Sequence, residues 1–460
     1  MPKPNQDPQE SKQPKFHDLL QEIKNPNAGG IDLASAEAVV AVPMGRDPSA
    51  VRTFSLYTRG LHELRDWLLT CGITTVAVES TANYWVCLYD VLEEAGIEVW
   101  LVNARHVKRV PGRKTDVCDA QWLQRLHCSG LLTKAFRPAQ QIVGLRHLMR
   151  HRAGLVQRAI AALQKVQKTL VECNLRLHHV LSDLDGATGQ RLVEAILAGE
   201  HDPEKLALLR DRRCRVSHQE LVDSLRGHYR PEYLFVLQQD WDHWKQTRVA
   251  IEQCDRKIDE WLKSVELEES YPEAKIESVA RSHKNSFGLD LQQEALRFYG
   301  VDLCTIPGVS TSTVAVLMSE VGSRSDLLKH FANAQAFSSW LCLCPENRIT
   351  GGKVFASKTR KSSNRLATAL RMAAQGLSNA KSALGDYSRA MKARLGKAEG
   401  ITATAHKLAR IIFSMIATRQ SYDPEKPFAL TPRKRSRLIA TMERRAQRLG
   451  FTLVPASVAE

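Results

Sequence analysis

Four acidic residues have the types and positions that metal-dependent phosphodiester chemistry needs. Asp32 and Glu79 each lie at the end of a short apolar run that predicts a buried strand, and Asp116 and Asp119 follow further along the chain. A carboxylate in an apolar run is costly unless something compensates it. The i, i+3 spacing of Asp116 and Asp119 places both on one helical face. Carboxylates from two strands and one helix can converge on a pair of Mg²⁺ ions, an arrangement that cuts or joins phosphodiesters.

The alternative is that these acids are helix caps and surface residues. Asp116 is suitably placed to cap the helix that follows it. A capping or surface role explains neither Asp32 nor Glu79, because both stand in apolar runs. The sequence therefore favours a metal site formed by all four carboxylates.

Cations are concentrated just before the paired aspartates. If phosphates approach an anionic metal site, basic residues beside it would balance their charge. Salt bridges among these charges are the structural alternative. Four arginines on the first long helix, in the periodic stretch 142–180, could likewise contact phosphates. The alternative for these four is that they form the solvated face of that helix. The first group comprises Arg105, Lys108, Arg109, Arg113 and Lys114, and the second Arg146, Arg150, Arg152 and Arg158.

The whole composition points to a polyanionic partner. The chain has 460 residues, a formal net charge of +15 and an apolar content of 43%, with a pI near 9.4. Such an excess of positive charge favours nucleic acid as the partner over a role in solubility alone. No apolar run is long enough to span a membrane, and the polar amino terminus predicts no signal peptide. The ten cysteines form no CxxC pair, which predicts reduced thiols in a cytoplasmic protein.

The elements that must position the four acids alternate between strands and helices. The pattern predicts strands at 31–33, 39–42, 51–56, 75–79 and 97–102, because each is a short apolar run bounded by turn residues. Helices are predicted from about 61 to Gly72 and from 84 to 95, before Gly96. The resulting order βββαβαβ, followed by a helix, is the order of an RNase H-like fold. In that fold the first strand carries one metal ligand and the fourth ends in another.

Two long periodic stretches follow this α/β part. Residues 142–180 carry Leu145, Leu148 and Leu155 and continue through Ile160 and Leu163. A second stretch has apolar residues spaced 7, 3, 4, 3 and 4 apart, an a/d seam. The two stretches predict either an intrachain helical hairpin or a coiled coil between protomers, with an ordinary helical bundle core as the structural alternative. The second seam consists of Trp244, Ile251, Cys254, Ile258, Trp261 and Val265.

The second half of the chain predicts a compact helical domain. Ile306-Pro307-Gly308-Val309 before a helix resembles one hairpin of a helix-hairpin-helix module, whose turn amides bind phosphate. A turn of purely structural meaning is the rival. A second constellation centres on Thr350, because glycines beside a hydroxyl let a phosphate approach and nearby cations can balance charge in phosphoryl transfer. Thr-Gly-Gly loops are common, so this loop taken alone is weak evidence for a nucleophile. The cations near Thr350 are Lys353, Lys358, Arg360, Lys361 and Arg365.

These patterns together divide the chain into six parts. The fold class is α/β at the amino end and all-α beyond it. The parts are a disordered arm at 1–27, the α/β catalytic domain at 28–135, a helical coiled-coil region at 136–270, a linker at 271–300, the carboxy-terminal domain at 301–420 and a basic tail at 421–460.

Taken together, the two constellations resemble the transposases of insertion-sequence family 110, in its 1111 subgroup. These are DEDD transposases that act as bridge-RNA-guided recombinases. The resemblance covers about residues 28–180 and 300–420, and its motifs are long. They lie at 30–32, 78–81, 84–85, 102–108, 111–119 and 121–123, and again at 306–308, 341–345, 350–353 and 402–410.

The resemblance implies a RuvC-like domain in which Asp32, Glu79, Asp116 and Asp119 bind Mg²⁺, or Mn²⁺ in its place. It also implies a coiled coil and a carboxy-terminal transposase domain with a nucleophilic serine just before Gly-Gly-Lys. Thr350 stands at that position here. Threonine is a known nucleophile type, but its methyl group crowds an in-line attack, so Ser357 is a candidate substitute.

The family's chemistry implies the partners. The hydroxyl attacks a DNA phosphate and forms a covalent protein–DNA intermediate, and the carboxylates of one protomer act with the hydroxyl of another. We therefore expect donor and target DNA, a structured guide RNA read by shape and backbone, and a homodimer or homotetramer. Two other functions remain open: a RuvC-like nuclease that hydrolyses DNA with water, and a catalytically inactive nucleic-acid-binding protein.

Overall fold

A mixed five-stranded sheet forms the centre of the first of two units into which the chain divides, residues 1–137 and 138–460. The computed structural model describes residues 22–79, 83–102, 116–277, 279, 284–350, 353–425, 432–452 and 454. Strand order is β3-β2-β1-β4-β5, with β1 antiparallel to β2 and parallel to β4. The strands are β1 (Ala28–Leu33), β2 (Glu37–Ala41), β3 (Val51–Ser55), β4 (Thr75–Glu79) and β5 (Glu98–Val102).

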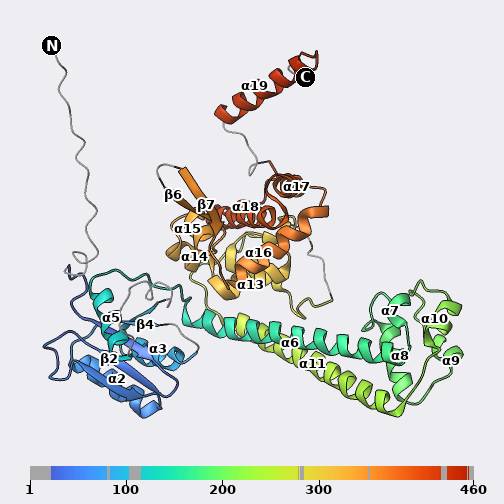
Figure 1. Cartoon of the computed structure of the whole chain (residues 1–460), viewed down its shortest axis with the longest axis horizontal. Helices are drawn as coiled ribbons and strands as arrows, with labels where there is room; N and C mark the ends of the chain where they lie inside the picture. The colour runs from blue at the N-terminus through green and yellow to red at the C-terminus, as the bar shows by residue number, and fades with distance from the viewer. Residues whose placement is uncertain are drawn as a thin grey trace. The chain divides into compact units, whose positions relative to one another are not determined.

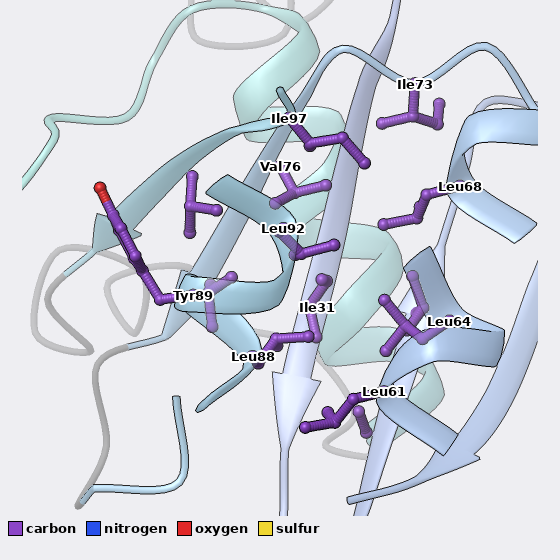
Figure 2. Close-up of a cluster of buried hydrophobic side chains, with 14 of the residues drawn as sticks. Ile31, Leu61, Leu64, Leu68, Ile73, Val76, Leu88, Tyr89, Leu92 and Ile97 are labelled. Atoms are coloured by element: carbon purple, nitrogen blue, oxygen red, sulfur yellow. The ribbon is translucent and has the colours of Figure 1, made fainter. Parts of the chain in front are cut away.

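The helices of this unit cover both faces of the sheet. On one face α2 (Thr58–Thr70) and α3 (Trp85–Glu94) bury Leu64 and Leu88 against Ile31 and Val78. Figure 2 shows this core, with side chains from both helices gathered around Ile31. On the other face α5 (Asp116–Cys128) buries Leu123 against Ala77. The predicted strands and helices are all present, and their order is consistent with an RNase H-like fold.

Two long helices run side by side in the second unit (Figure 1). They are α6 (Gln140–Glu172) and α11 (Pro231–Ser264). The pair is antiparallel, because Trp261 donates a hydrogen bond to the carbonyl of Gln141 near one end, whereas Lys165 lies 4.0 Å from Asp240 towards the other. Four shorter helices connect them: α7 (Leu177–Val180), α8 (Ala187–Leu197), α9 (Pro203–Ala207) and α10 (His218–Leu225).

The seam between α6 and α11 differs in part from the predicted one. Ile251, Cys254 and Ile258 are buried on α11 as expected. On α6, however, Ala159 and Ala162 are buried, while Ile160 is 37% exposed. Small alanines let the two backbones approach, so at this level the seam follows the alanines rather than the larger apolar side chains. Whether this pair also forms a coiled coil between protomers stays a prediction.

Three of the four α6 arginines make hydrogen bonds within the second unit. Arg150 makes two hydrogen bonds to the Glu320 carboxylate, at 2.9 and 2.7 Å. Arg146 donates to the Ser319 and Glu320 carbonyls at 3.1 and 2.8 Å. Arg152 is buried against Asp255. The contacts of Arg146 and Arg150 tie the helical hairpin to the rest of the unit, whereas Arg152 joins α6 to α11. The side chains of Arg150 and Arg158 are exposed.

Helix α18 (Lys397–Thr418) has a buried face that includes Leu408 and Phe413. Phe413 and Phe337 have ring centroids 5.9 Å apart. No helix among the described residues is both long and apolar enough to cross a bilayer. The other elements are α12 (Leu291–Tyr299), η1 (Leu303–Thr305), α13 (Thr311–Val321), α14 (Arg324–His330), α15 (Ala334–Trp340), β6 (Pro345–Thr350), β7 (Lys353–Thr359), α16 (Arg365–Gly376), η2 (Leu377–Asn379), α17 (Ala383–Leu395) and α19 (Pro432–Arg448).

Two predictions for this half differ from the structure. The predicted linker at 271–300 contains helix α12, which buries Phe298 and Tyr299 and is therefore part of the core. The predicted all-helical domain contains a β-hairpin, β6–β7, at the very segment that carries Thr350. The predicted arm at 1–27 lies largely outside the described residues, as does part of the tail.

Candidate functional site

The ends of β1 and β4 bring Asp32 and Glu79 together. The two strands pair in parallel, with Ile31 opposite Val78. Continuing this register by one residue places Asp32 opposite Glu79. Ile31 and Val78 face the core under α2 and α3. Because side chains alternate along a strand, the next residues face the other side of the sheet, where α5 packs. Both acids are half-buried.

Close packing of α5 on β1 fixes where its acids lie. A Cβ atom on Gly30 would come within 2.3 Å of the Gln124 nitrogen and 2.4 Å of the Ala120 carbonyl oxygen. Further back along β1, the Ala28 carbonyl accepts a hydrogen bond from the Gln124 amide at 3.3 Å, and Cys128 also reaches it. Helix α5 therefore runs opposite to β1, and its first turn lies towards Asp32.

That first turn carries the other two predicted ligands. Asp119 is half-buried, one residue before Ala120, which packs against Val39 and Ala41 of β2. Asp116 begins the helix, and its side chain lies outside the description. The described side chains contain no group of three acidic, histidine or cysteine residues already placed around one ion. The backbone thus brings the four positions to one edge of the sheet, while the description leaves out one of the four side chains.

The predicted phosphate contacts before α5 lie outside the described residues. Arg105, Lys108, Arg109, Arg113 and Lys114 all fall within 103–115. Their predicted role therefore stays a prediction.

Thr350 is at the tip of the β6–β7 hairpin. It is the last residue of β6, it is exposed, and it pairs with Lys353 across the turn. Gly351 and Gly352, between the paired residues, lie outside the description. A hydroxyl in this position is open to a large ligand such as a nucleic-acid strand.

Ser357, the other candidate nucleophile, is placed differently. It stands on β7 opposite Asn347, and its hydroxyl donates a 2.8 Å hydrogen bond to the Asn347 side chain. Between Ser357 and the turn, the pairing skips one residue: Arg348 pairs with Ala356 and Ile349 with Val354. Phe355 is the extra residue of this bulge, and its ring is 83% exposed. Of the two hydroxyls, that of Thr350 lies nearer the turn.

Exposed cations follow Thr350 along the chain, on β7 and just beyond it. Lys358, Lys361 and Arg365 are exposed, and Arg365 begins α16, whose amino end is capped by Asn364. Arg360 also has a structural role, because its guanidinium donates a 2.8 Å hydrogen bond to the Ser339 carbonyl at the end of α15. The side chain of Lys353 lies outside the description.

The Ile-Pro-Gly-Val turn makes the contacts of a packed structural turn. Gly308 has a φ of 85°, which favours glycine. A Cβ atom there would lie 2.9 Å from Leu377 and 3.1 Å from the Ala373 carbonyl oxygen. Ile306 and Val309 are buried. A phosphate-binding role for the turn amides stays a prediction.

Sequence reasoning missed the hairpin and the buried pair Arg152–Asp255. A Gly-Gly pair between segments of alternating polarity is a hairpin signal, and 347–356 shows it. No local signal marks Arg152 and Asp255, because they lie on different helices that meet only in the folded chain.

A mixed sheet with acids at adjacent strand ends, followed by a helix that returns acids to the same edge, defines a class of enzymes that act on nucleic acids. Two family models match the chain. A transposase model of the IS110 DEDD type matches residues 29–175, and a model described as "Transposase IS116/IS110/IS902 family" matches residues 302–389. Together they cover just over half of the chain. No curated protein matches it closely enough to count as a relative.

The chain belongs to the IS110 family of transposases. It is accordingly an enzyme that acts on DNA in transposition and recombination. The first match takes in the sheet from Gly29 onwards and all of α6, and the second takes in the β6–β7 hairpin. Both candidate centres therefore lie inside matched segments.

Proposed function

We propose that this transposase cuts and rejoins DNA with two centres, a metal site at the carboxylate edge of the sheet and the hydroxyl of Thr350. The observation that carries the proposal is the parallel register of β1 and β4, which aligns Asp32 with Glu79 on the α5 side of the sheet. Without that register the acids would have no common edge.

The residues at this edge fit a divalent cation. Carboxylate oxygens are the hard donors that Mg²⁺ prefers and that Mn²⁺ accepts. Asp32, Glu79, Asp116 and Asp119 would hold the ions. Bound there, the metal would supply Lewis-acid charge at a scissile phosphate. Half-burial of Asp32, Glu79 and Asp119 leaves their oxygens within reach of a ligand while the core beneath fixes their backbone.

Thr350 would be the nucleophile of the covalent step. Its Oγ would form a bond to phosphorus as the bond from phosphorus to the leaving deoxyribose oxygen breaks. The threonine loses its hydroxyl proton, and the leaving oxygen gains one. The reverse reaction with another DNA end releases Thr350 and joins the strands. No oxidant or nucleotide is needed, because one phosphodiester is exchanged for another.

Exposed cations would position the DNA at the hairpin. Lys358 is exposed on β7, and Lys361 and Arg365 are exposed on the segment that follows it. Arg365 begins α16, and the partial positive charge at the amino end of a helix favours a phosphate. Lys353 and Arg360 complete this group, with Arg360 holding α15 at the same time. Arg105, Lys108, Arg109, Arg113 and Lys114 would serve the metal centre in the same way.

The finer expectations from the family complete the proposal. The protein would act in the cytoplasm as a dimer or tetramer, as a member of the 1111 subgroup. A structured bridge RNA would select donor and target sequences, and the RuvC-like domain of one protomer would act with Thr350 of another. The α6–α11 pair would then be the segment through which protomers meet.

The extra methyl group of Thr350 favours one rival, a metal-dependent nuclease that uses water instead of a side-chain hydroxyl. A covalent adduct separates the two. We expect DNA that is nicked near the cleavage point to trap the protein as an adduct that survives denaturing electrophoresis. Thr350→Ala should abolish the adduct, Thr350→Ser should form it faster, and the control Ser357→Ala should retain it. Cleavage by water that persists in Thr350→Ala would contradict a recombinase.

The sharing of centres between protomers can be tested by mixing. Asp32→Asn and Thr350→Ala should each be inactive alone, whereas the mixture should recover part of the strand joining. Glu94→Gln, an exposed acid on α3, is the matched control and should be fully active. Failure of every mixture to recover activity would contradict a site composed from two protomers. Joining abolished by Asp32→Asn but present in the wild type would also rule out an inactive binding protein.

A further inference from the structure

A pocket along helix α18 gathers residues that the proposed chemistry does not use. It has a volume of about 540 Å³, within the ~300–1,000 Å³ range of small-ligand sites. One wall is a stripe of α18 that includes His406, Lys407, Arg410 and Ser414, and α17 contributes Tyr387. These α18 residues extend the 402–410 motif of the sequence, which lies beyond both matched family segments.

The opposite wall is formed by the chain as it leaves α18. Arg419 ends the helix with a φ of 55° and turns the chain back, and residues 420–423 then line the pocket. Contacts with residues 271–277 anchor this wall. Arg419 donates a 2.8 Å hydrogen bond to Glu273 and stacks over Tyr271, while Ser421 donates to Glu277. The pocket is therefore built by anchored segments on both sides.

The lining combines apolar, aromatic and cationic side chains. Ile411 and Met415 are buried and give it an apolar floor. The half-buried rings of Tyr387 and Tyr422 flank that floor. Lys407 and Arg410, one turn apart on α18, add positive charge to the lining, and the Lys407 Nζ lies 5.9 Å from the centre of the Tyr387 ring. A ligand that matches this lining combines a flat ring with an anionic group.

His406 adds a neutral hydrogen-bonding group to the lining. Burial, together with the neighbouring Arg410 and Lys407, lowers the pKa of His406. The imidazole is therefore neutral at neutral pH and can both donate and accept a hydrogen bond. Asp423 is the one acidic residue of the lining, so the pocket keeps a positive balance with Lys407 and Arg410.

Arg410 lies close enough to the start of the β6–β7 hairpin to act electrostatically on it. Arg410 and Arg360 both act electrostatically on the Cys344 thiol, and Cys344 directly precedes β6. Arg360 in turn holds the end of α15. A strand that lies on the β6–β7 hairpin thus has a short route to Arg410.

We infer that this pocket binds one unpaired nucleotide of a strand that reaches the hairpin, with its phosphate at Arg410 and Lys407 and its base over Met415 beside the tyrosines. The inference rests on the proposed function, because that function brings a nucleic-acid strand to the β6–β7 hairpin. Both RNA and DNA offer this chemistry, as an unpaired guide nucleotide or as a base extruded next to the cleavage point. The base would gain stacking on aromatic and apolar side chains, which tolerates any sequence.

Binding to short single strands tests the pocket without any strand joining. Fluorescence anisotropy of the full-length protein, without Mg²⁺, would use labelled RNA and DNA oligonucleotides, each intact and with one abasic position. We expect Arg410→Ala to weaken binding and to reduce the slope of log affinity against log salt by about 0.7, the value for one lost phosphate contact on a single strand. Lys397→Ala, which removes an exposed charge from the same helix outside the pocket, should change affinity less.

A pocket-filling variant tests the base. Ser414 is exposed in the pocket wall, so Ser414→Trp should fill the space without disturbing the core. For the wild type, the abasic strand should bind about tenfold more weakly than the intact strand, the effect of losing one stacked base. In Ser414→Trp this difference should disappear. Tighter binding of RNA would assign the nucleotide to the guide, and tighter binding of DNA to the substrate strand.

The failure of this inference differs from the failure of the proposed function. If Arg410→Ala and Ser414→Trp bind every oligonucleotide as the wild type does, the pocket is not a nucleotide site, whatever the adduct experiment shows. If Thr350→Ala still joins strands while the pocket variants lose abasic discrimination, the pocket stands and the assigned nucleophile is wrong. Thermal unfolding of each variant confirms that it is folded.

Discussion

In the sequence, the acids of the first unit and the arginines of the second are both candidates for a nucleic-acid site, but the fold places them differently. Asp32 and Glu79 stand half-buried at strand ends, on the face of the sheet where α5 packs. Arg146, Arg150 and Arg152 bind protein carbonyls and carboxylates, and of the three only Arg150 has an exposed side chain. A cation near a functional segment is therefore weak support for a phosphate contact until its own hydrogen-bond partners are known.

The two units also bury polar groups differently. The second buries a charged pair, Arg152 with Asp255. Arg152 also donates to the Ser286 carbonyl and stacks over the Phe287 ring, and the Gly288 amide donates to Asp255. The first buries His127, whose side chain hydrogen-bonds Thr75 at 2.9 Å. Burial lowers the pKa of His127 to about 4, so it is buried uncharged. The buried polar group of the second unit is thus an ion pair, whereas that of the first is an uncharged imidazole ring.

The largest expected effect on stability is in the ion pair. Arg152→Met removes the partner of a buried carboxylate, which costs roughly 3–5 kcal/mol in the free energy of unfolding. Urea unfolding would measure it, with the exposed Arg158→Ala as the matched control within ~0.5 kcal/mol. Replacing both partners, in Arg152→Met with Asp255→Leu, should recover much of the loss. A single-variant loss below ~1 kcal/mol would mean that the pair is well solvated.

The buried histidine predicts how the first unit responds to acid. Since its folded pKa is about 4 and its reference value is 6.5, the unfolded chain takes up the proton first as pH falls. The stabilising contribution is complete above pH 6.5 and is lost progressively towards pH 4, by roughly 3 kcal/mol in total. His127→Gln should remove this part of the pH dependence, whereas His62→Gln, at an exposed position on α2, should leave it. Equal pH dependence in wild type and His127→Gln would contradict a neutral buried ring.

A smaller effect tests how α5 is seated. Gly30→Ala places a methyl group against the backbone of Ala120 and Gln124, so the helix must shift, at a cost of about 1–3 kcal/mol. Strand joining should fall as well, because Asp119 moves with the helix. Gly29→Ala is the matched control on the adjacent residue, where the nearest contact is a side-chain carbon of Val76 at 3.1 Å. If both variants behave alike, the close approach of α5 does not position the carboxylates.

The sheet unit was predictable because its signals are local. Short apolar runs gave the strands, and Gly72 and Gly96, both with positive φ, marked where α2 and α3 end. The convergence of Asp32 and Glu79 follows from the parallel register, which element order already implies. The position of Asp119 could not be derived in this way, because it depends on the contact between Gly30 and α5.

The second unit was harder to predict for two physical reasons. Its β6–β7 hairpin is a single two-stranded sheet between helices, and the Gly-Gly pair is its main local signal. The predicted α6 seam is confirmed at Leu145 and Leu155, but it also included Ile160, where Ala159 and Ala162 are buried instead. Spacing alone cannot decide between a large side chain and a small one when the backbones approach closely. The Arg152–Asp255 pair joins two helices distant in sequence, so it becomes visible only once they pack.

Metal uptake tests the central claim most directly. Calorimetric titration of the full-length protein with Mn²⁺ or Mg²⁺ should show saturable binding, and Asp32→Ala and Asp119→Ala should each weaken it strongly. Glu94→Gln should bind as the wild type does. Saturable uptake that is unchanged in both aspartate variants, or no uptake by the wild type, would contradict a metal site at the shared edge of β1, β4 and α5.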